Sequence, residues 1–399
     1  MIRLVLFDDD CRTMLQPFSW TRPVADFRIG IFTIREKWEQ RLQAISTTFT
    51  EEHLRGLWPF EPDAAGENLW INARVLPSAE LAAEVKSLRT GEALVKGDLL
   101  VACNAGKFTD PLKIASKDHL GGDFGIRQTN TPAIVIHRLH DLFTHNGQAI
   151  REDFELLSGK ESQPLSKTVT VLGNHPVFVE KDVVAEACVI NATKGPVYIG
   201  EGAELMEGSV VRGPLAIGAH AVIKMSAKIY GDTTIGPGCK VGGEVSNSVF
   251  FANSNKAHDG FIGNSVIGEW CNLGADTNCS NLKNNYGDVS TWNYAIDGYE
   301  NTGLTFHGLL MGDHAKCGIN TMFNTGTVAG VGANIFGGGF PPKFIPDFSW
   351  GGAEGFAEYQ FEKAAETIQR VFARRGKNLE KAELEMLRSV FLKTGKYRK

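Results

Sequence analysis

Residues 199–241 read "IGEGAELMEGSVVRGPLAIGAHAVIKMSAKIYGDTTIGPGCKV", with an aliphatic residue at every sixth position. An amphipathic helix would repeat about every 3.6 residues and an ordinary strand about every two, whereas a six-residue period is typical of a parallel β-helix. Three such units close one coil, so the aliphatic side chains should stack inside the coil in continuous columns. The members of this ladder are Ile199, Leu205, Val211, Ile217, Ile223, Ile229, Ile235 and Val241.

The ladder is interrupted twice further along the chain. After Val241 we expect the same spacing to resume with Phe261, Ile267, Leu273 and Cys279. It breaks again across residues 281–310 and is predicted to resume with Met311, Cys317, Phe323, Ala329 and Ile335. Insertions between coils of such a solenoid map to loops on its outside, often on the binding face. His258 lies where the ladder first breaks off and restarts, and a β-helix can hold such a histidine either as a functional group or as a structural residue at a bend.

Composition narrows the class of protein. The chain has 399 residues, is 43% hydrophobic and carries a net charge of −5, which fits two or three globular domains. The acidic balance and the lack of a basic run argue against nucleic acid as a partner. No apolar run is long enough to span a bilayer. The seven cysteines include no C-x-x-C pair, so neither a zinc site nor a disulfide framework is expected, and a cytoplasmic location is the default.

The segment "AHDGFIGNSVIGEWCNLGADTNCSN" at 257–281 resembles the central acetyltransferase motif of the bifunctional N-acetylglucosamine-1-phosphate uridyltransferase / glucosamine-1-phosphate acetyltransferase family. The resemblance implies that the β-helix is left-handed, forms a homotrimer and binds acetyl-CoA between neighbouring subunits. It also implies an N-terminal Rossmann-like nucleotidyltransferase domain, here in a shortened and divergent form.

The same resemblance assigns roles to individual residues. His258 falls on the catalytic base, Asn272 on the asparagine that holds the sugar, and Phe261 on a tyrosine that faces the sugar phosphate. Ala275 and Asn281 match positions on the acetyl-CoA side. The remaining candidates are Lys228, Lys240, Lys256 and Lys283 for the substrate phosphate, and Gly318 and Lys343 for the CoA.

Elementary chemistry agrees with a histidine base. Acetyl transfer to a sugar amine needs the neutral amine, and an imidazole with a pKa of about 6.5 can accept its proton. Such a base contributes roughly 10²–10⁴-fold to the rate. From spacing alone, however, a single histidine beside an apolar stripe is usually structural, and the motif at 257–281 is what favours catalysis.

The N-terminal strand "IRLVLF" runs into "DDDCRTMLQPFSWTRP" at 8–23, where the family has a glycine-rich loop. Three aspartates there would repel a triphosphate unless a metal bridges them. Arg12 is a remnant of the family loop, and Arg22 and Arg28 are candidates to bind phosphate in its place. Asp98 lies in a context similar to the family's metal-binding aspartate, which would bring Mg²⁺ to this domain.

The polar stretch "SGKESQPLSKTVT" at 158–170 is the best boundary. We therefore expect a nucleotidyltransferase-like α/β domain at 1–165, a β-helix at 176–345, and a loop with helices at 346–399. The expected activity is acetyl transfer to glucosamine-1-phosphate, with uridylyl transfer in the N-terminal domain left open. The alternatives are a sugar-1-phosphate nucleotidyltransferase (uridylyl or thymidylyl) whose β-helix is structural, and a catalytically degenerate scaffold that binds a sugar nucleotide.

Overall fold

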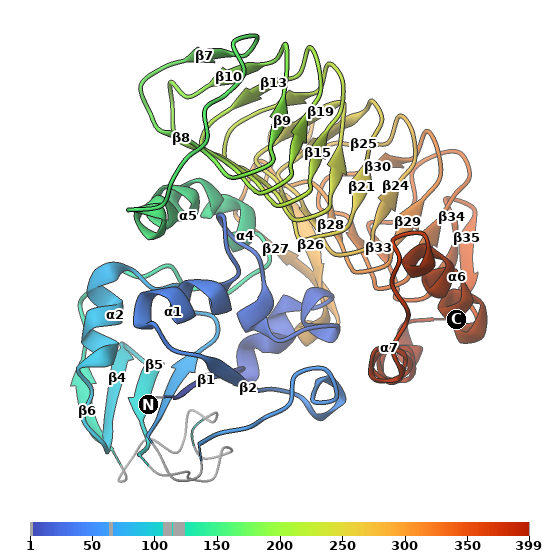
Figure 1. Ribbon diagram of the computed structural model, residues 1–399. Helices are drawn as coiled ribbons and strands as arrows, with labels where there is room; N and C mark the ends of the chain where they lie inside the picture. Colours follow the sequence, from blue (N-terminus) through green and yellow to red (C-terminus); the bar gives the residue numbers. More distant parts are fainter. Residues whose placement is uncertain (1–2, 64–66, 107–113, 115–123, 399) are drawn as a thin grey trace. The chain divides into compact units, whose positions relative to one another are not determined.

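The computed structural model describes residues 3–63, 67–106, 114 and 124–398. Contacts divide the chain into two compact units (Figure 1). The first unit comprises residues 1–15, 22–27 and 32–137, and the second comprises residues 16–21, 28–31 and 138–399. Each unit has its own buried core.

The first unit is built on a mixed six-stranded sheet in the order β2-β1-β3-β5-β4-β6. β1 is parallel to β2 and β3, and β5 is antiparallel to β3 and β4. Helices α1 and α2 pack side by side (Figure 1). A capping box between Thr33 and Glu36 fixes the start of α1, and the Trp38 indole donates to the Val75 carbonyl at 2.8 Å. The bounds are β1 Arg3–Phe7, α1 Ile34–Leu42, β2 Ser46–Phe49, β3 Asn68–Asn72, α2 Ala79–Lys86, β4 Glu92–Lys96, β5 Leu99–Asn104 and β6 Gly125–Gln128.

The second unit is a parallel β-helix made of three long sheets, as the six-residue period predicts (Figure 1). The first sheet contains β7 Thr170–Leu172, β10 Val189–Asn191, β13 Val210–Arg212, β16 Lys228–Ile229, β19 Glu244–Ser246 and β22 Phe261–Gly263. The second contains β8 Val177–Val179, β11 Val197–Ile199, β14 Leu215–Ile217, β17 Thr233–Ile235, β20 Val249–Phe250, β23 Val266–Ile267, β28 Leu310–Met311, β31 Val328–Ala329 and β33 Phe344–Ile345. The third contains β9 Val184–Ala185, β12 Glu204–Leu205, β15 Val222–Ile223, β18 Lys240–Val241, β21 Asn255–Lys256, β24 Asn272–Leu273, β29 Lys316–Cys317, β32 Asn334–Ile335, β34 Ser349–Gly352 and β35 Gly355–Glu358.

Two short pairs and four helices complete this unit. β25 (Asn278–Cys279) pairs with β30 (Met322–Phe323), and β26 (Ser290–Asn293) forms a hairpin with β27 (Gly298–Asn301) inside the predicted insertion at 281–310. The helices are α4 Asp141–Thr144, α5 Asn146–Asp153, α6 Phe361–Ala373 and α7 Lys381–Lys393. No helix among the described residues is both long enough and apolar enough to cross a membrane.

The predicted ladder forms the core of the β-helix. All eight residues from Ile199 to Val241 are at most 2% exposed. The expected restart at Phe261 is wrong by one residue, because Ile262, which is fully buried, pairs with Val245 and points inward. The inward residues that follow Val241 are Val245 and Phe250, which are fewer than six residues apart. The strict period is therefore shifted by one residue, and Phe261 is not the inward residue of its strand.

The contact boundary also lies upstream of the predicted domain end at 165. Residues 138–165 belong to the second unit because α5 packs against β14 and β17. The buried Asn146 amide donates to the Asp232 carbonyl at 2.9 Å, and the Thr234 hydroxyl donates to the Asn146 side-chain oxygen at 3.0 Å. At the other end, β34 continues the third sheet past the predicted limit at 345, since Trp350 pairs with Asn334.

Candidate functional site

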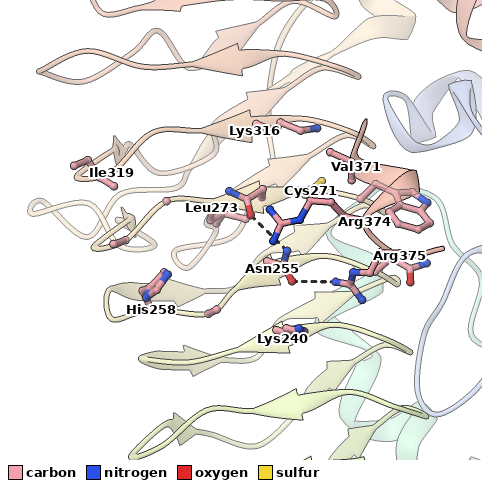
Figure 2. Close-up of a pocket in the computed structure, with 16 residues that line it drawn as sticks. Lys240, Asn255, His258, Cys271, Leu273, Lys316, Ile319, Val371, Arg374 and Arg375 are labelled. Carbon is pink, nitrogen blue, oxygen red and sulfur yellow. Dashed lines mark hydrogen bonds between the residues drawn. The ribbon is translucent and has the colours of Figure 1, made fainter. Parts of the chain in front are cut away.

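A pocket of about 640 Å³ lies in the second unit, on the outer face of the third sheet (Figure 2). Strands β18, β21, β24 and β29 supply its floor, and the C-terminal end of α6 supplies one side. The lining residues are Lys240, Asn253, Asn255, Ala257, His258, Trp270, Cys271, Asn272, Leu273, Gly274, Ala275, Lys316, Ile319, Val371, Arg374 and Arg375.

His258 lines this pocket from the loop between β21 and β22, and it is exposed. Its carbonyl accepts a hydrogen bond from the Lys256 ammonium at 2.8 Å. Two residues further on, Gly260 adopts a φ of +112°, and a Cβ there would lie 2.2 Å from the Thr277 carbonyl oxygen. Only glycine fits this turn, so the conformation of the backbone defines the position of His258 at the pocket surface.

Asn272 lines the same pocket as His258 and pairs with Asn255 on the neighbouring strand. The Asn255 amide donates to the Asn272 side-chain oxygen at 3.5 Å (Figure 2). Lys240 and Ala275 line the same pocket. The structure therefore brings together four of the residues singled out from the sequence, and their roles stay predictions.

The other β-helix candidates lie outside the lining, and most have partners of their own. Lys228 forms an ion pair with Glu244 at 3.6 Å on the first sheet. Lys283 donates to the Asp288 carbonyl, and Lys343 donates to the Ser290 carbonyl at 2.5 Å. The Asn281 amide donates to the Asn264 side-chain oxygen at 2.8 Å.

Phe261 and Gly318 are also absent from the lining. The Phe261 backbone N–H donates to the Asn278 side-chain oxygen at 2.8 Å. Gly318 lies under the pocket wall, where its backbone atoms come within 2.4 Å of a Cβ built on Gly274. This close approach gives Gly318 a packing role in the wall.

Lys256 does not fit the predicted role in binding substrate phosphate. It is 1% exposed and pairs with Val241 in an inward column of the third sheet, where every other coil places an apolar residue. Its ammonium donates to the carbonyls of Gly242 at 3.1 Å and His258 at 2.8 Å. The Lys256 side chain thus lies in the interior of the β-helix and holds the loop that carries His258 by a hydrogen bond to its backbone. Burial lowers the pKa of Lys256 to about 8.

We expect the stability difference between the wild type and Lys256→Met to depend on pH. An unfolded lysine keeps its proton up to about pH 10.5, whereas the folded one releases it near pH 8, so the unfolded state binds more protons between these values. The free energy of unfolding of the wild type should therefore rise relative to the variant by about 3 kcal/mol from pH 8 to pH 10.5. Urea unfolding at several pH values measures this. Leu273→Met, in the next strand, removes no titratable group and should show a constant difference.

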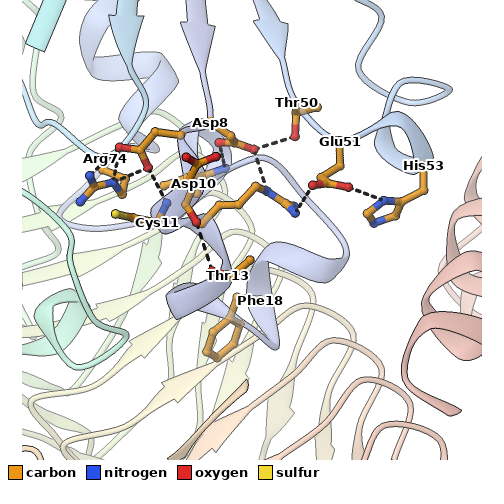
Figure 3. Close-up of polar contacts among 12 residues, drawn as sticks. Asp8, Asp10, Cys11, Thr13, Phe18, Thr50, Glu51, His53 and Arg74 are labelled. Carbon is orange, nitrogen blue, oxygen red and sulfur yellow. Dashed lines mark hydrogen bonds and ion pairs between the residues drawn. The ribbon is translucent and has the colours of Figure 1, made fainter. Parts of the chain in front are cut away.

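Two of the three aspartates after β1, Asp8 and Asp9, have side-chain partners within the first unit (Figure 3). Asp8 is buried and accepts hydrogen bonds from the Thr50 hydroxyl at 2.6 Å and the Val24 backbone N–H at 3.0 Å. Its carboxylate also pairs with Arg12 at 3.3 Å. Burial raises the pKa of Asp8, while the charge of Arg12 opposes the rise.

Asp9 is paired more tightly than Asp8. The buried Arg74 guanidinium donates to both of its carboxylate oxygens, at 2.9 and 2.5 Å. The Asn72 amide and the Cys11 backbone N–H add bonds of 2.9 and 3.0 Å. The Asp8 and Asp9 carboxylates are thus occupied by protein partners, whereas Asp10 is exposed.

The remaining N-terminal candidates have separate surroundings, and their predicted roles stay predictions. Arg12 contacts Asp8 and Glu51, and Arg22 is buried. The Arg28 guanidinium donates to the Ile31 carbonyl at 2.7 Å, and Asp98 is exposed in the turn between β4 and β5. Within the described ranges, no group of three His, Cys, Asp or Glu side chains is arranged to hold a metal ion.

Comparison with known proteins finds one family model and several relatives that match part of the chain. Residues 4–162 match a family model described as sugar nucleotidyl transferase. The bifunctional protein GlmU of Synechococcus elongatus is 26% identical over 221 residues, which cover 53% of this chain and 45% of that protein. GlmU of Methanococcus vannielii is 32% identical over 122 residues, covering 30% of this chain and 28% of that protein. Over part of its length, the chain is similar to GlmU proteins. It spans about half the length of the first of these relatives.

Two further likenesses concern acyltransferases. YaiX of Escherichia coli K12, a putative uncharacterized acetyltransferase, is 30% identical over 152 residues, covering 37% of this GlmU-like chain and 65% of YaiX. The solved structure of an Arabidopsis UDP-N-acetylglucosamine acyltransferase matches at 14% identity with a TM-score of 0.23, covering 59% of this chain and 91% of that one.

Sequence reasoning missed three of the four lysine and arginine side chains that line the pocket. Arg374 and Arg375 come from the end of α6, and Lys316 comes from β29. The pattern at 353–374 shows only an amphipathic helix, and the pair of arginines before Gly376 is the one local signal for a site there. The periodicity of a helix does not indicate which sheet of the β-helix the C-terminal end of α6 contacts.

Proposed function

We propose that the β-helix unit transfers an acetyl group from acetyl-CoA to the amine of an amino-sugar 1-phosphate, taken to be glucosamine-1-phosphate, with His258 as the base. The observation that carries this proposal is the single pocket lined by His258, Asn272, Ala275 and Lys240. The GlmU and YaiX likenesses support a transferase of this class.

In the proposed reaction, the His258 imidazole accepts the proton of the amine as its nitrogen attacks the thioester carbonyl. The C–N bond forms, the C–S bond breaks, and the His258 imidazolium returns the proton to the CoA sulfur, so that CoA leaves as its thiol. Backbone N–H groups at the pocket turns would stabilise the oxyanion of the tetrahedral intermediate. Asn272 would bind the sugar, and Ala275 would contact the donor.

The transfer is direct in this proposal, without an acyl-enzyme. Cys271 is the one cysteine in the pocket lining, and it is 1% exposed. Burial raises the pKa of its thiol, and its Sγ lies 3.2 Å from the Gly312 carbonyl oxygen. A thiol held in the neutral form is a poor nucleophile, so Cys271 serves as a small filler in the wall.

The proposal includes a cytoplasmic homotrimer in which acetyl-CoA binds next to a neighbouring subunit. The exposed position of His258 supports this, because a base with one open side needs a further wall to exclude water.

The test is thiol release from acetyl-CoA by the full chain, with glucosamine-1-phosphate, glucosamine-6-phosphate or no acceptor. We expect turnover with the 1-phosphate and a background rate without an acceptor. Silence with every amino-sugar phosphate would overturn the proposal and favour the scaffold alternative, which binds ligand without turnover.

A second candidate is sugar-1-phosphate nucleotidyl transfer in the first unit, and the family match at 4–162 favours it. The paired state of Asp8 and Asp9 opposes it, because neither carboxylate is open to Mg²⁺. Pyrophosphate release from UTP or dTTP with N-acetylglucosamine-1-phosphate and Mg²⁺ tests this activity separately.

A further inference from the structure

The floor of the pocket is a row of polar residues that runs across four neighbouring strands of the third sheet. Lys240 pairs with Asn255, Asn255 with Asn272, and Asn272 with Lys316. At a strand spacing of about 4.8 Å, the row spans roughly 14 Å. Two amides, suited to sugar hydroxyls, thus lie between two lysines.

The C-terminal end of α6 is fixed beside this row. Phe372 packs on Trp270 with ring centroids 4.3 Å apart, and the Lys377 ammonium lies 5.2 Å from the centroid of the same indole. The Arg375 guanidinium donates to the Gly238 carbonyl at 3.0 Å and to the Asn255 side-chain oxygen at 3.2 Å (Figure 2). The helix end therefore has a defined position, and it brings two guanidinium groups to the pocket.

The positive charge of this pocket is not neutralised. Its lining contains Lys240, Lys316, Arg374 and Arg375, and no Asp or Glu. In the part of the chain that the structure describes, the side chains of Arg374 and Lys240 form neither a hydrogen bond nor an ion pair. Like charges brought together without a counter-charge repel one another, which an anion bound between them would relieve.

We propose that this pocket binds a phosphate group, with Arg374 and Lys240 as its direct ligands and Arg375 as the residue that positions the end of α6. A guanidinium fork matches two phosphate oxygens, and a lysine adds a compact charge. The phosphate belongs to the sugar 1-phosphate acceptor, because the amides of Asn255 and Asn272 lie in the same row. This identification rests on the proposed function, whereas the phosphate site itself does not.

The location differs from the expectation drawn from family resemblance. That expectation placed the phosphate ligands on lysines of the coils and the inserted loop, of which Lys228, Lys256 and Lys283 are engaged elsewhere. The C-terminal helix supplies the missing charge, which gives residues 361–375 a part in substrate selection as well as in packing.

Equilibrium binding by calorimetry, without turnover, tests the site in the full chain. The probes are glucosamine-1-phosphate, glucosamine, orthophosphate, CoA and dephospho-CoA. The variant is Arg374→Gln, and the matched control is Arg370→Gln, one turn earlier on α6, where the guanidinium pairs with Glu366 at 2.5 Å. We expect Arg374→Gln to weaken glucosamine-1-phosphate binding by about 10–100-fold and the control by less than about twofold.

The other probes locate the phosphate. Orthophosphate should compete with glucosamine-1-phosphate in the wild type, and unphosphorylated glucosamine should bind the wild type and Arg374→Gln alike. If Arg374→Gln weakens CoA but not dephospho-CoA or the sugar phosphate, the phosphate site stands and its assignment to the acceptor is overturned. Unchanged affinity for every phosphate-bearing probe would overturn the site itself. Binding that depends on Arg374 but gives no thiol release would support the site and contradict the proposed function.

Discussion

We expect the replacement of His258 with Gln to lower the rate of thiol release from acetyl-CoA with glucosamine-1-phosphate by about 10²–10⁴-fold, the usual contribution of a general base. Glutamine keeps a polar side chain of similar reach but does not accept a proton at neutral pH. Because the imidazole is exposed, its loss should leave folding intact. Steady-state kinetics should show the loss in kcat, with little change in KM for the sugar phosphate.

The control for this experiment is His175→Gln. His175 is also exposed on the β-helix unit but does not line the pocket, so both kcat and the unfolding midpoint should match the wild type. A His258→Gln variant that keeps more than about a tenth of the rate would show that His258 is not the base. A loss of rate accompanied by a lowered unfolding midpoint would instead place His258 among the structural residues of the bend.

The sequence predicted the β-helix well because its period is a local property. Each coil buries one side chain per strand, so residues such as Ile217 and Ile235, which pair across β14 and β17, can be identified without knowledge of any distant contact. The prediction failed where corners shorten. A strict six-residue period predicts that Phe261 points inward, whereas Ile262 is the buried residue in the structure. In the preceding strand, β21, the inward residue is Lys256. A buried lysine in an apolar column breaks the pattern from which the register is read.

Only the part of the site that comes from one continuous stretch of sequence could be predicted. His258, Asn272 and Ala275 lie within 18 residues of one another in a recognisable motif, and the structure brings them to one pocket. Arg374 reaches the same pocket through the contact of Phe372 with Trp270, which lies about 100 residues earlier in the chain. Nothing in the periodicity of α6 specifies that contact, because an amphipathic helix end can pack on any apolar patch.

The acidic loop after β1 could likewise not be interpreted from local sequence. Asp8 and Asp9 look like a break in a phosphate-binding loop, but the partner that explains Asp9 is Arg74, 65 residues downstream. We expect Arg74→Met to lower the free energy of unfolding of the first unit by about 3–5 kcal/mol, because it leaves the buried Asp9 carboxylate without its countercharge. Hydrogen exchange of the β1 and β3 amides, read by mass spectrometry in the full chain, reports on this unit alone.

The double variant Arg74→Met/Asp9→Asn is the matched control for that experiment. Asparagine has the shape of aspartate without its charge, so the double variant should regain a substantial part of the protection that Arg74→Met loses. Mg²⁺ with UTP should not raise the protection of wild-type β1, because both carboxylates already have protein partners. A clear rise on adding Mg²⁺ and UTP would show that these aspartates release Arg12 and Arg74 to bind a metal, and nucleotidyl transfer would then become the better-supported activity of the first unit. An Arg74→Met variant as stable as the wild type would contradict the structural role of the Asp9–Arg74 pair.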